Sequence, residues 1–211
     1  MMAEPARRID AILLDFGGVL IELVGVEQML DWCPQLGGTD ELWRRWLHSP
    51  AVRRFETGAS TREEFAAEIV DEFGLPVGGE DFLRAFTHWP RALFPGVAEL
   101  LVGLAPRCRL ASVSNTNELH WERFEREWSL PGYFHHNFPS HRVGMLKPDA
   151  AYFRHVIEAL AVDAERVLFI DDNRINVDAA ARLGIVARHA VGVDGLVAAL
   201  AEFNLPGGTD T

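Results

Sequence analysis

Cysteine and long hydrophobic runs are both scarce in this sequence, and each scarcity argues against a class of protein. The 211 residues contain only two cysteines, Cys33 and Cys108, too few for a disulfide framework and not spaced as a metal-binding pair. A reducing cytoplasm is therefore the expected compartment. No run of about 18 apolar residues is present, so no membrane-spanning helix is expected. The N-terminal segment shows no small-residue cleavage site, which argues against a secretory signal.

The charge balance is acidic, and the cations are nearly all arginine. A formal net charge of -11 argues against nucleic acids and anionic membranes as partners. It also means that a site for an anionic substrate must create its own local positive field. Apolar residues make up 48% and charged residues 24%, which is typical of a globular protein with one sizeable core and room for a small inserted module. The composition leaves monomer and homodimer equally open.

Short apolar runs that end at polar residues recur along the chain and predict a parallel sheet. They cover residues 9–15, 109–113, 166–170 and 185–189. Helical patterns alternate with them at residues 96–104, 118–128, 150–160 and 175–183. This alternation is typical of an α/β fold with helices on both faces of the sheet. We predict a Rossmann-like three-layer core formed by residues 1–21 and 93–211.

Residues 22–92 break the alternation and predict an inserted all-helical module. Helical patterns without a convincing strand occur at residues 26–32, 40–48, 61–73 and 81–89. Ser60 and Glu63 match a capping box at the start of the third. Four of the six tryptophans lie in this segment, where we expect them to pack in the core of the module or against the sheet.

The first predicted strand ends at Asp15, and two glycines follow. Ligands of parallel sheets bind outside the carboxyl ends of the strands, so a carboxylate here is well placed for chemistry. Gly17 and Gly18 allow a sharp turn and leave backbone N–H groups free to hold an anion. An aspartate that merely closes a strand before a turn is the alternative.

Two further loops carry groups suited to a phosphate. Ser114 and Asn115 end the second predicted strand and could bind phosphate oxygens at a helix N-terminus. Asn115 also matches a capping box with Glu118, a use that leaves Ser114 free. Lys147 lies just before Pro148 and could neutralise both a carboxylate and a phosphate. A solvated surface lysine is the alternative, but lysines are rare in this chain.

The third run ends at Asp171 and Asp172, with Asn176 one turn further on. Adjacent carboxylates at the end of an apolar strand repel each other. Mg²⁺ held by oxygen ligands would offset that repulsion. Helix N-capping would explain one of the two aspartates and leave the other unexplained.

Taken in order, these strand ends resemble the haloacid dehalogenase-like superfamily. The matching segments read DFGGV, VSNTN, GMLKPD and FIDDNRINVDAAARLGI, and the similarity covers nearly the whole chain. The helical module at residues 22–92 is similar to the small C1 cap of subfamily IA. Its segment RRFETGASTREEF resembles the subfamily that contains bacterial phosphatases acting on glucose 1-phosphate. The resemblance implies a phosphatase of a small phosphorylated metabolite, with a sugar phosphate such as a sugar 1-phosphate as the expected substrate.

The same resemblance implies a nucleophile and a metal site. Asp15 is expected to attack phosphorus in line and form an aspartyl-phosphate. The expected ligands of Mg²⁺ are the Asp15 carboxylate, the Gly17 carbonyl and the Asp172 carboxylate. Asp171 is expected to be a further ligand, either directly or through an intervening group.

Phosphate binding and charge balance are also implied by the resemblance. Ser114 and Asn115, together with the backbone at Gly18, are expected to bind the phosphate oxygens. Lys147 is expected to stabilise the transferring group together with the metal.

Gly17 departs from the pattern of most phosphatases in this superfamily, which carry a second Asp two residues after the nucleophile. That Asp serves as the general acid for the leaving group and later as the base for water, a contribution typically worth about 10²–10⁴-fold. A substrate with a good leaving group, such as the anomeric oxygen of a sugar 1-phosphate, would need it less. Alternatively, the cap supplies the acid, and Glu56, His88 and Glu22 are the candidates.

Two other functions stay open at this point. One is a phosphate-ligand binding or regulatory protein with weak catalysis, because Gly17 cannot transfer protons. The other is a 2-haloacid dehalogenase, a class of the superfamily that also lacks the second Asp. Those enzymes need no metal, whereas Asp171 and Asp172 beside an anionic nucleophile favour phosphoryl chemistry.

Overall fold

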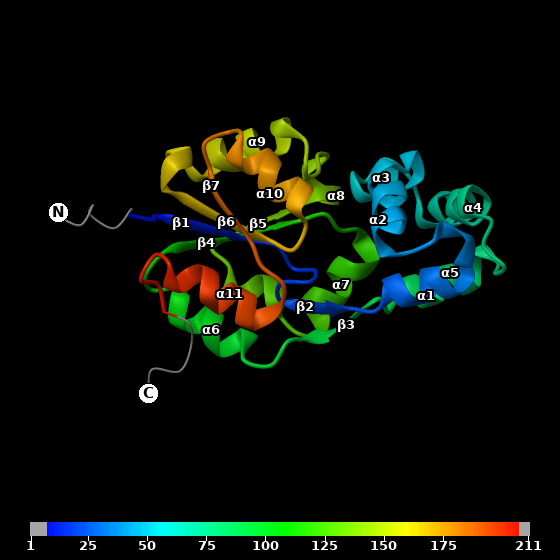
Figure 1. The fold of residues 1–211 in the computed structure, drawn as a ribbon, viewed down its shortest axis with the longest axis horizontal. Coiled ribbons are helices and arrows are strands. Elements are labelled where there is room, and N and C mark those ends of the chain that lie inside the picture. The colour runs from blue at the N-terminus through cyan, green and yellow to red at the C-terminus, as the bar shows by residue number, and fades with distance from the viewer. Residues whose placement is uncertain (1–7, 207–211) are drawn as a thin grey trace.

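The computed structural model describes residues 8–206, which form an α/β core beside a helical cap (Figure 1). The strands are β1 (Ala11–Leu14), β2 (Ile21–Leu23), β3 (Pro90–Leu93), β4 (Arg109–Ser114), β5 (His136–Pro139), β6 (Val167–Asp171) and β7 (Val186–His189). The cap helices are α1 (Gly25–Trp32), α2 (Thr39–His48), α3 (Pro50–Glu56), α4 (Arg62–Phe73) and α5 (Gly79–Thr87). The core helices are α6 (Val97–Leu104), α7 (Glu118–Arg126), α8 (Ser140–Val143), α9 (Ala150–Leu160), α10 (Arg174–Ala181) and α11 (Gly192–Ala201).

The central sheet is parallel, with strand order β5-β4-β1-β6-β7. The chain moves to one side of β1 with β4 and β5, and to the other side with β6 and β7. Crevices for ligands form at such a reversal, at the carboxyl ends of the strands. The loops after β1, β4 and β6 therefore converge at one edge of the sheet, as the positions of the polar residues predict.

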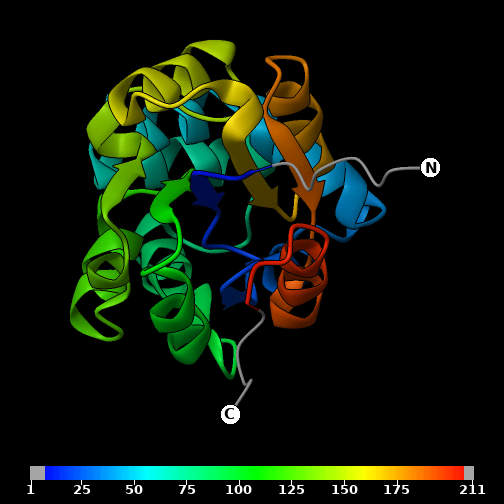
Figure 2. The same cartoon turned by 90° about the vertical axis from the view of Figure 1, so that its left-hand side faces the viewer.

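Helices cover both faces of this sheet, which confirms the predicted three-layer α/β core (Figure 2). Ile12 and Leu14 of β1 pack on the face covered by α6, α7 and α11. Ala11 and Leu13 point to the opposite face, under α9 and α10. All four residues are fully buried, as expected for a central parallel strand covered on both sides.

The cap has a hydrophobic core of its own, formed by residues between Met29 and Phe86. Trp46 lies at its centre, with ring contacts to four other aromatic side chains. The antiparallel pair of β2 and β3 forms the two connections between cap and core. The prediction of an inserted all-helical cap is thus confirmed, while its exact division from the core at residues 22 and 92 stays a prediction.

Direct contacts hold the cap against the sheet's functional edge. Arg53 on α3 forms an ion pair with Asp149 at 2.6 Å, just beyond the loop that carries Lys147. Gly58 lies against the backbone of His141, where an added Cβ would be 2.5 Å from the carbonyl oxygen. Its φ of +72° is a further reason for glycine at this position. The end of α3 therefore meets the core closely.

Several sequence predictions require correction. The strands β2 and β3 lie at the edges of residues 22–92 and were not predicted. Each has only three or four residues with little alternation of apolar and polar side chains. The capping box of α4 uses Thr61 and Glu64, one residue later than predicted. Asn115 does not cap α7, because Asn117 is the N-cap residue and accepts from the N–H of His120. The elements α3, β5, α8 and α11 were not predicted.

Within residues 8–206, no helix combines the length and hydropathy that a membrane crossing needs. The prediction about a secretory signal depends on residues 1–7, which lie outside the described part of the chain.

Candidate active site

Three carboxylates meet at the carboxyl ends of β1 and β6. Asp15 directly follows β1, Asp171 is the last residue of β6, and Asp172 follows it. One oxygen from each lies within 4.8 Å of the others. Asp171 is fully buried and Asp15 is 9% exposed. The parallel register pairs Leu14 with Ile170, so Asp15 and Asp171 lie side by side although they are 156 positions apart in the sequence.

Lys147 is the cation that faces this cluster, and it is the only lysine in the sequence. Its Nζ lies 2.6 Å from Oδ2 of Asp171 and 3.0 Å from Oδ1 of Asp15. The lysine is 1% exposed, so the alternative of a solvated surface residue is wrong. Burial disfavours its charged form, but the two carboxylates outweigh that effect and hold the Lys147 pKa above its usual value.

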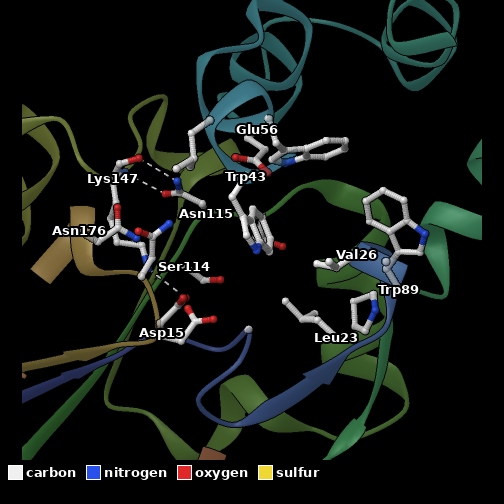
Figure 3. A pocket seen from close by; sticks show the side chains of 18 of the residues that line it. Asp15, Leu23, Val26, Trp43, Glu56, Trp89, Ser114, Asn115, Lys147 and Asn176 are labelled. Carbon is white, nitrogen blue, oxygen red and sulfur yellow. Dashed lines mark hydrogen bonds and ion pairs between the residues drawn. The ribbon is translucent and has the colours of Figure 1, made fainter. Parts of the chain in front are cut away.

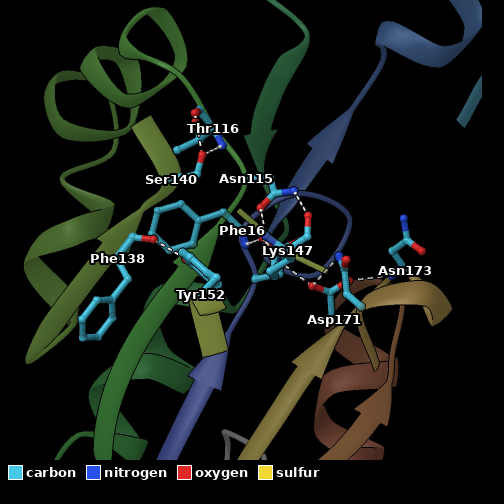
Figure 4. Close-up of polar contacts among 11 residues, drawn as sticks. Phe16, Asn115, Thr116, Phe138, Ser140, Lys147, Tyr152, Asp171 and Asn173 are labelled. Atoms are coloured by element: carbon cyan, nitrogen blue, oxygen red, sulfur yellow. Dashed lines mark hydrogen bonds and ion pairs between the residues drawn. The ribbon is translucent and has the colours of Figure 1, made fainter. Parts of the chain in front are cut away.

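The two oxygens of Asp171 are already occupied by hydrogen-bond donors. Besides Lys147, the side-chain amide of Asn176 donates to both oxygens at 3.0 and 3.2 Å, and the Asn173 N–H donates to Oδ1 at 2.8 Å (Figure 4). These contacts indicate that Asp171 positions Lys147, and they count against Asp171 as a direct metal ligand. Asn176 lies in the first turn of α10, and its contact with Asp171 was not predicted.

The loop after Asp15 passes close to Asp172. Gly18 has φ +67°, and an added Cβ would lie 2.0 Å from Oδ2 of Asp172. Only glycine fits this approach. The Gly18 N–H donates to the Ile21 carbonyl at 2.9 Å. Its role as a phosphate ligand stays a prediction, and this hydrogen bond counts against it.

Asn115 connects the loop after β4 to the lysine loop. Its side-chain amide donates to the Lys147 carbonyl, and its Oδ1 accepts from the Lys147 N–H, both at 2.8 Å. Both ends of the side chain are therefore committed to holding the Lys147 backbone, and a phosphate contact by Asn115 would have to come from its backbone. Ser114 is buried and lines the cavity described below, where its predicted phosphate contact has room.

The charges of the site leave a place for a divalent cation. Three carboxylates face one ammonium group, an excess of two negative charges in a buried setting. Burial raises the pKa of Asp172, and the charges of Asp15 and Asp171 raise it further. Carboxylate and carbonyl oxygens are the donors that Mg²⁺ prefers. Asp15, Asp172 and the Gly17 backbone border the same cavity, so the residues present fit such an ion.

A cavity of about 490 Å³ extends from these residues toward the cap. Its volume is in the range of small-molecule sites, roughly 300–1,000 Å³. Figure 3 shows the polar groups on the sheet side and apolar side chains, including Leu23, Val26 and Trp89, on the other. The apolar lining comprises Leu23, Val26, Met29, Leu42, Trp43, Trp46, Leu47, Phe86 and Trp89. The sequence did not predict this apolar wall, because its members come from separate helices.

Of the three acids proposed for the cap, Glu56 alone lines this cavity within the described residues. It is the last residue of α3 and lies on the cap side (Figure 3). His88 is exposed, and its Nδ1 lies 2.8 Å from the Arg84 carbonyl. Glu22 forms an ion pair with Arg91 at 3.4 Å, outside the cavity.

Comparison with known proteins places the chain in a family. The model of the haloacid dehalogenase-like hydrolases matches residues 9–184. A drimenol cyclase from Aspergillus calidoustus is 46% identical over 188 residues, covering 84% of this chain and 33% of that protein, so the chain spans about a third of the relative's length. A sesquiterpene phosphatase from Aspergillus oryzae is 25% identical over 193 residues, covering 85% of this chain and 88% of that protein.

A solved structure supports the same family. A HAD family enzyme from Bacteroides thetaiotaomicron, in complex with magnesium and inorganic phosphate, superposes with a TM-score of 0.69 at 26% identity, covering 86% of this chain and 94% of that one. The protein described here belongs to the haloacid dehalogenase-like hydrolase family.

Proposed function

We propose that this protein is a Mg²⁺-dependent phosphatase that hydrolyses a small phosphorylated metabolite through an aspartyl-phosphate on Asp15. The observation that carries the proposal is the group of Asp15, Asp172 and the buried Lys147 at the floor of a ligand-sized cavity. A metal-free dehalogenase would gain nothing from Asp172 beside its nucleophile. The magnesium and phosphate bound to the relative from Bacteroides thetaiotaomicron support the same reading.

In the proposed reaction, Asp15 attacks phosphorus and Lys147 keeps its carboxylate ionised and oriented. Their 3.0 Å contact serves both purposes. The bond between phosphorus and the leaving oxygen breaks, and water then hydrolyses the acyl phosphate to release inorganic phosphate. Ser114 would hold a phosphoryl oxygen, and Asp15, Asp172 and Gly17 would hold Mg²⁺, which neutralises charge on the transferring group when bound.

Asp172→Asn is expected to remove the response of the protein to Mg²⁺. In the wild type, an ion bound at 100 times its Kd would add about 2.7 kcal/mol to the free energy of unfolding. The variant should lose that gain and the metal-dependent activity, yet be at least as stable as the wild type without metal, because one of three clustered charges is gone. Thermal unfolding with and without MgCl₂ measures this, and Asp178→Asn on α10 is the matched control. An unchanged Mg²⁺ response in Asp172→Asn would show that the ion binds elsewhere.

The apolar wall indicates the substrate class. Aromatic and aliphatic side chains line most of the cap side of the cavity, where Arg44 and Glu56 are the charged side chains among the described residues. We propose a phosphate monoester of an apolar alcohol, of the isoprenoid type. The sesquiterpene phosphatase from Aspergillus oryzae, matched along most of its length, supports this class.

A sugar 1-phosphate is the second candidate, and Gly17 is the observation that favours it. With no acid in the loop after the nucleophile, an acidic leaving group such as an anomeric hydroxyl would be an advantage. The similarity of residues 53–65 to phosphatases of glucose 1-phosphate points the same way.

Release of inorganic phosphate from a panel of substrates tests the proposal. The panel contains isoprenyl monophosphates of different chain length, sugar 1-phosphates and a short alkyl phosphate, each with and without Mg²⁺. We expect metal-dependent release with the highest kcat/KM for the isoprenyl compounds. Highest turnover of sugar 1-phosphates would favour the second candidate. No release from any compound by the folded, metal-replete protein would leave the binding-protein alternative.

Trp43→Ala separates substrates by their apolar part. Trp43 is partly exposed and lines the cavity, whereas its neighbour Trp46 packs in the core of the cap. Loss of a contact of this size costs about 1.5–3 kcal/mol, so kcat/KM for an isoprenyl phosphate should fall roughly tenfold or more. Turnover of the short alkyl phosphate should change little. Equal losses for both substrates, in a variant with wild-type thermal stability, would contradict an apolar substrate site at Trp43.

A further inference from the structure

The leaving group of the proposed reaction must face the cap. In-line displacement puts the leaving oxygen on the side of phosphorus opposite the nucleophile. Asp15 lies on the sheet side of the cavity, and the cap forms the opposite wall (Figure 3). A group that protonates this oxygen is therefore well placed on the cap.

The loop after Asp15 lacks the acid that related phosphatases carry there, and an acid at that position would require the Leu23 side chain to shift. A Cβ added at Gly17 would lie 2.8 Å from Cδ1 of Leu23. Leu23 belongs to β2 and also lines the cavity, so it fills the place where a longer side chain at position 17 would lie. Position 17, where related phosphatases carry aspartate, is thus a glycine with an apolar side chain beside it.

We infer that Glu56 is the general acid and base of this site, a role that rests on the proposed phosphatase function. Its carboxyl group comes from the end of α3 and reaches the cavity on the side that the leaving oxygen would occupy. The Arg53–Asp149 ion pair and the close approach of Gly58 to His141 hold this turn of the cap against the core. Glu56 is thereby positioned by the same loops that carry the catalytic residues of the core.

The histidines that line the cavity are committed to other contacts. His120 is close to the Phe86 carbonyl through Nε2 at 2.7 Å and to the Asn117 amide through Nδ1 at 3.2 Å. His189 donates through Nε2 to the Asp172 carbonyl at 2.8 Å. Burial lowers the pKa of His120 to about 4, so this ring is uncharged at neutral pH, and its Nε2–H donates to the Phe86 carbonyl. Among the described residues that line the cavity, Glu56 is the carboxyl group on the cap side.

The surroundings of Glu56 suit a group that both gives and takes a proton. Burial raises its pKa to about 7. Lys147, Arg53 and a hydrogen bond from the Trp46 indole lower the pKa, and the charge of Asp15 raises it, without cancelling the effect of burial. A pKa near the working pH is the condition under which acid–base catalysis is most effective.

Glu56 begins the proposed reaction protonated, and Asp15 begins it as a carboxylate. Asp15 forms a bond to phosphorus, the bond to the leaving oxygen breaks, and its electron pair takes the proton of Glu56 to give a neutral alcohol. The Glu56 carboxylate then accepts a proton from water as the water oxygen attacks the aspartyl-phosphate. The phosphorus–Asp15 bond breaks, and inorganic phosphate leaves with both carboxyl groups restored to their starting states.

Leaving-group dependence tests this role in Glu56→Gln. For a simple alkyl phosphate, kcat/KM should fall by about 10²-fold or more, because the alkoxide must leave unprotonated. For p-nitrophenyl phosphate, whose leaving group needs no proton, the fall should be less than about fivefold. In the wild type, kcat/KM for the alkyl substrate should decrease as pH rises through about 7, where Glu56 loses its proton, and the variant should lack this decrease. Glu68→Gln, on the cap but outside the cavity, is the matched control.

The possible results separate this inference from the function on which it rests. Equal losses for alkyl and aryl substrates, or an unchanged pH profile, would overturn the role of Glu56 while leaving the phosphatase intact. Wild-type phosphate release from neither substrate would overturn the proposed function and this inference with it.

Discussion

Replacing Asp15 with asparagine is expected to abolish phosphate release while leaving the protein folded. An amide cannot form the acyl phosphate, so kcat should fall by at least about 10⁴-fold. The side chains have the same shape, and Lys147 keeps its 2.6 Å contact with Asp171. Burial raises the pKa of Asp15 to about 6, so its ionised form lowers stability at neutral pH, and the free energy of unfolding of the variant should not fall below that of the wild type.

Two measurements check this expectation. Acid quenching with a labelled phosphate ester should leave label on the wild-type chain and none on Asp15→Asn. Asp10→Asn is the matched control, because Asp10 lies at the opposite end of β1 and pairs with Arg8 and Arg166. Activity that survives in Asp15→Asn, in a sample free of deamidated protein, would exclude Asp15 as the nucleophile.

The core could be predicted because its strands carry a strong local pattern. β1, β4 and β6 are apolar runs buried on both faces, and each ends at a polar residue that a buried strand does not need. Since parallel strands end at one edge, the convergence of Asp15, Ser114 and Asp171 followed from their order alone. The strand β5, His136–Pro139, escaped prediction because an exposed His and Asn at the edge of the sheet give it no apolar pattern.

What could not be predicted depends on contacts between distant residues. Asn115 reads as a helix cap in sequence, but its amide binds the backbone of Lys147, 32 positions later. Glu56 was one of three candidates, and only the packing of α3 on the core distinguished it. This helix is a short turn that starts at Pro50, below the length at which periodicity is informative. The apolar wall of the cavity likewise could not be predicted, because it forms only where the folded cap packs over the sheet.

Lys147→Met is expected to lower stability as well as activity. The lysine is buried beside two carboxylates, and its removal leaves Asp15 and Asp171 without their cation. Breaking one partner out of a buried ion pair typically costs about 3–5 kcal/mol. Methionine fills a similar volume against Phe169, whose ring centre lies 5.7 Å from Nζ, so lost packing should contribute little. Phosphate release should become undetectable.

The dependence of this loss on pH follows from the charges. Lys147 has a raised pKa, so its contribution is fully present below the ordinary lysine value and is lost only as pH rises through the higher one. In the variant, the carboxylates have lost their cation, so their charged forms are disfavoured. The loss of stability relative to the wild type should therefore grow as pH rises from acid to neutral. Urea unfolding at two pH values measures it, in buffers without divalent cations.

A double variant decides whether charge is the cause. Lys147→Met combined with Asp171→Asn removes one of the two orphaned carboxylates and keeps the shape of the site, including room for the Asn176 amide. Most of the lost stability should return, since the two positions are coupled through a 2.6 Å contact, while activity should stay absent. Recovery of stability without activity would assign Lys147 both roles, holding the buried carboxylates together and preparing Asp15 for attack. If the double variant were no more stable than Lys147→Met, the deficit would come from packing, and Lys147 would act on the reaction alone.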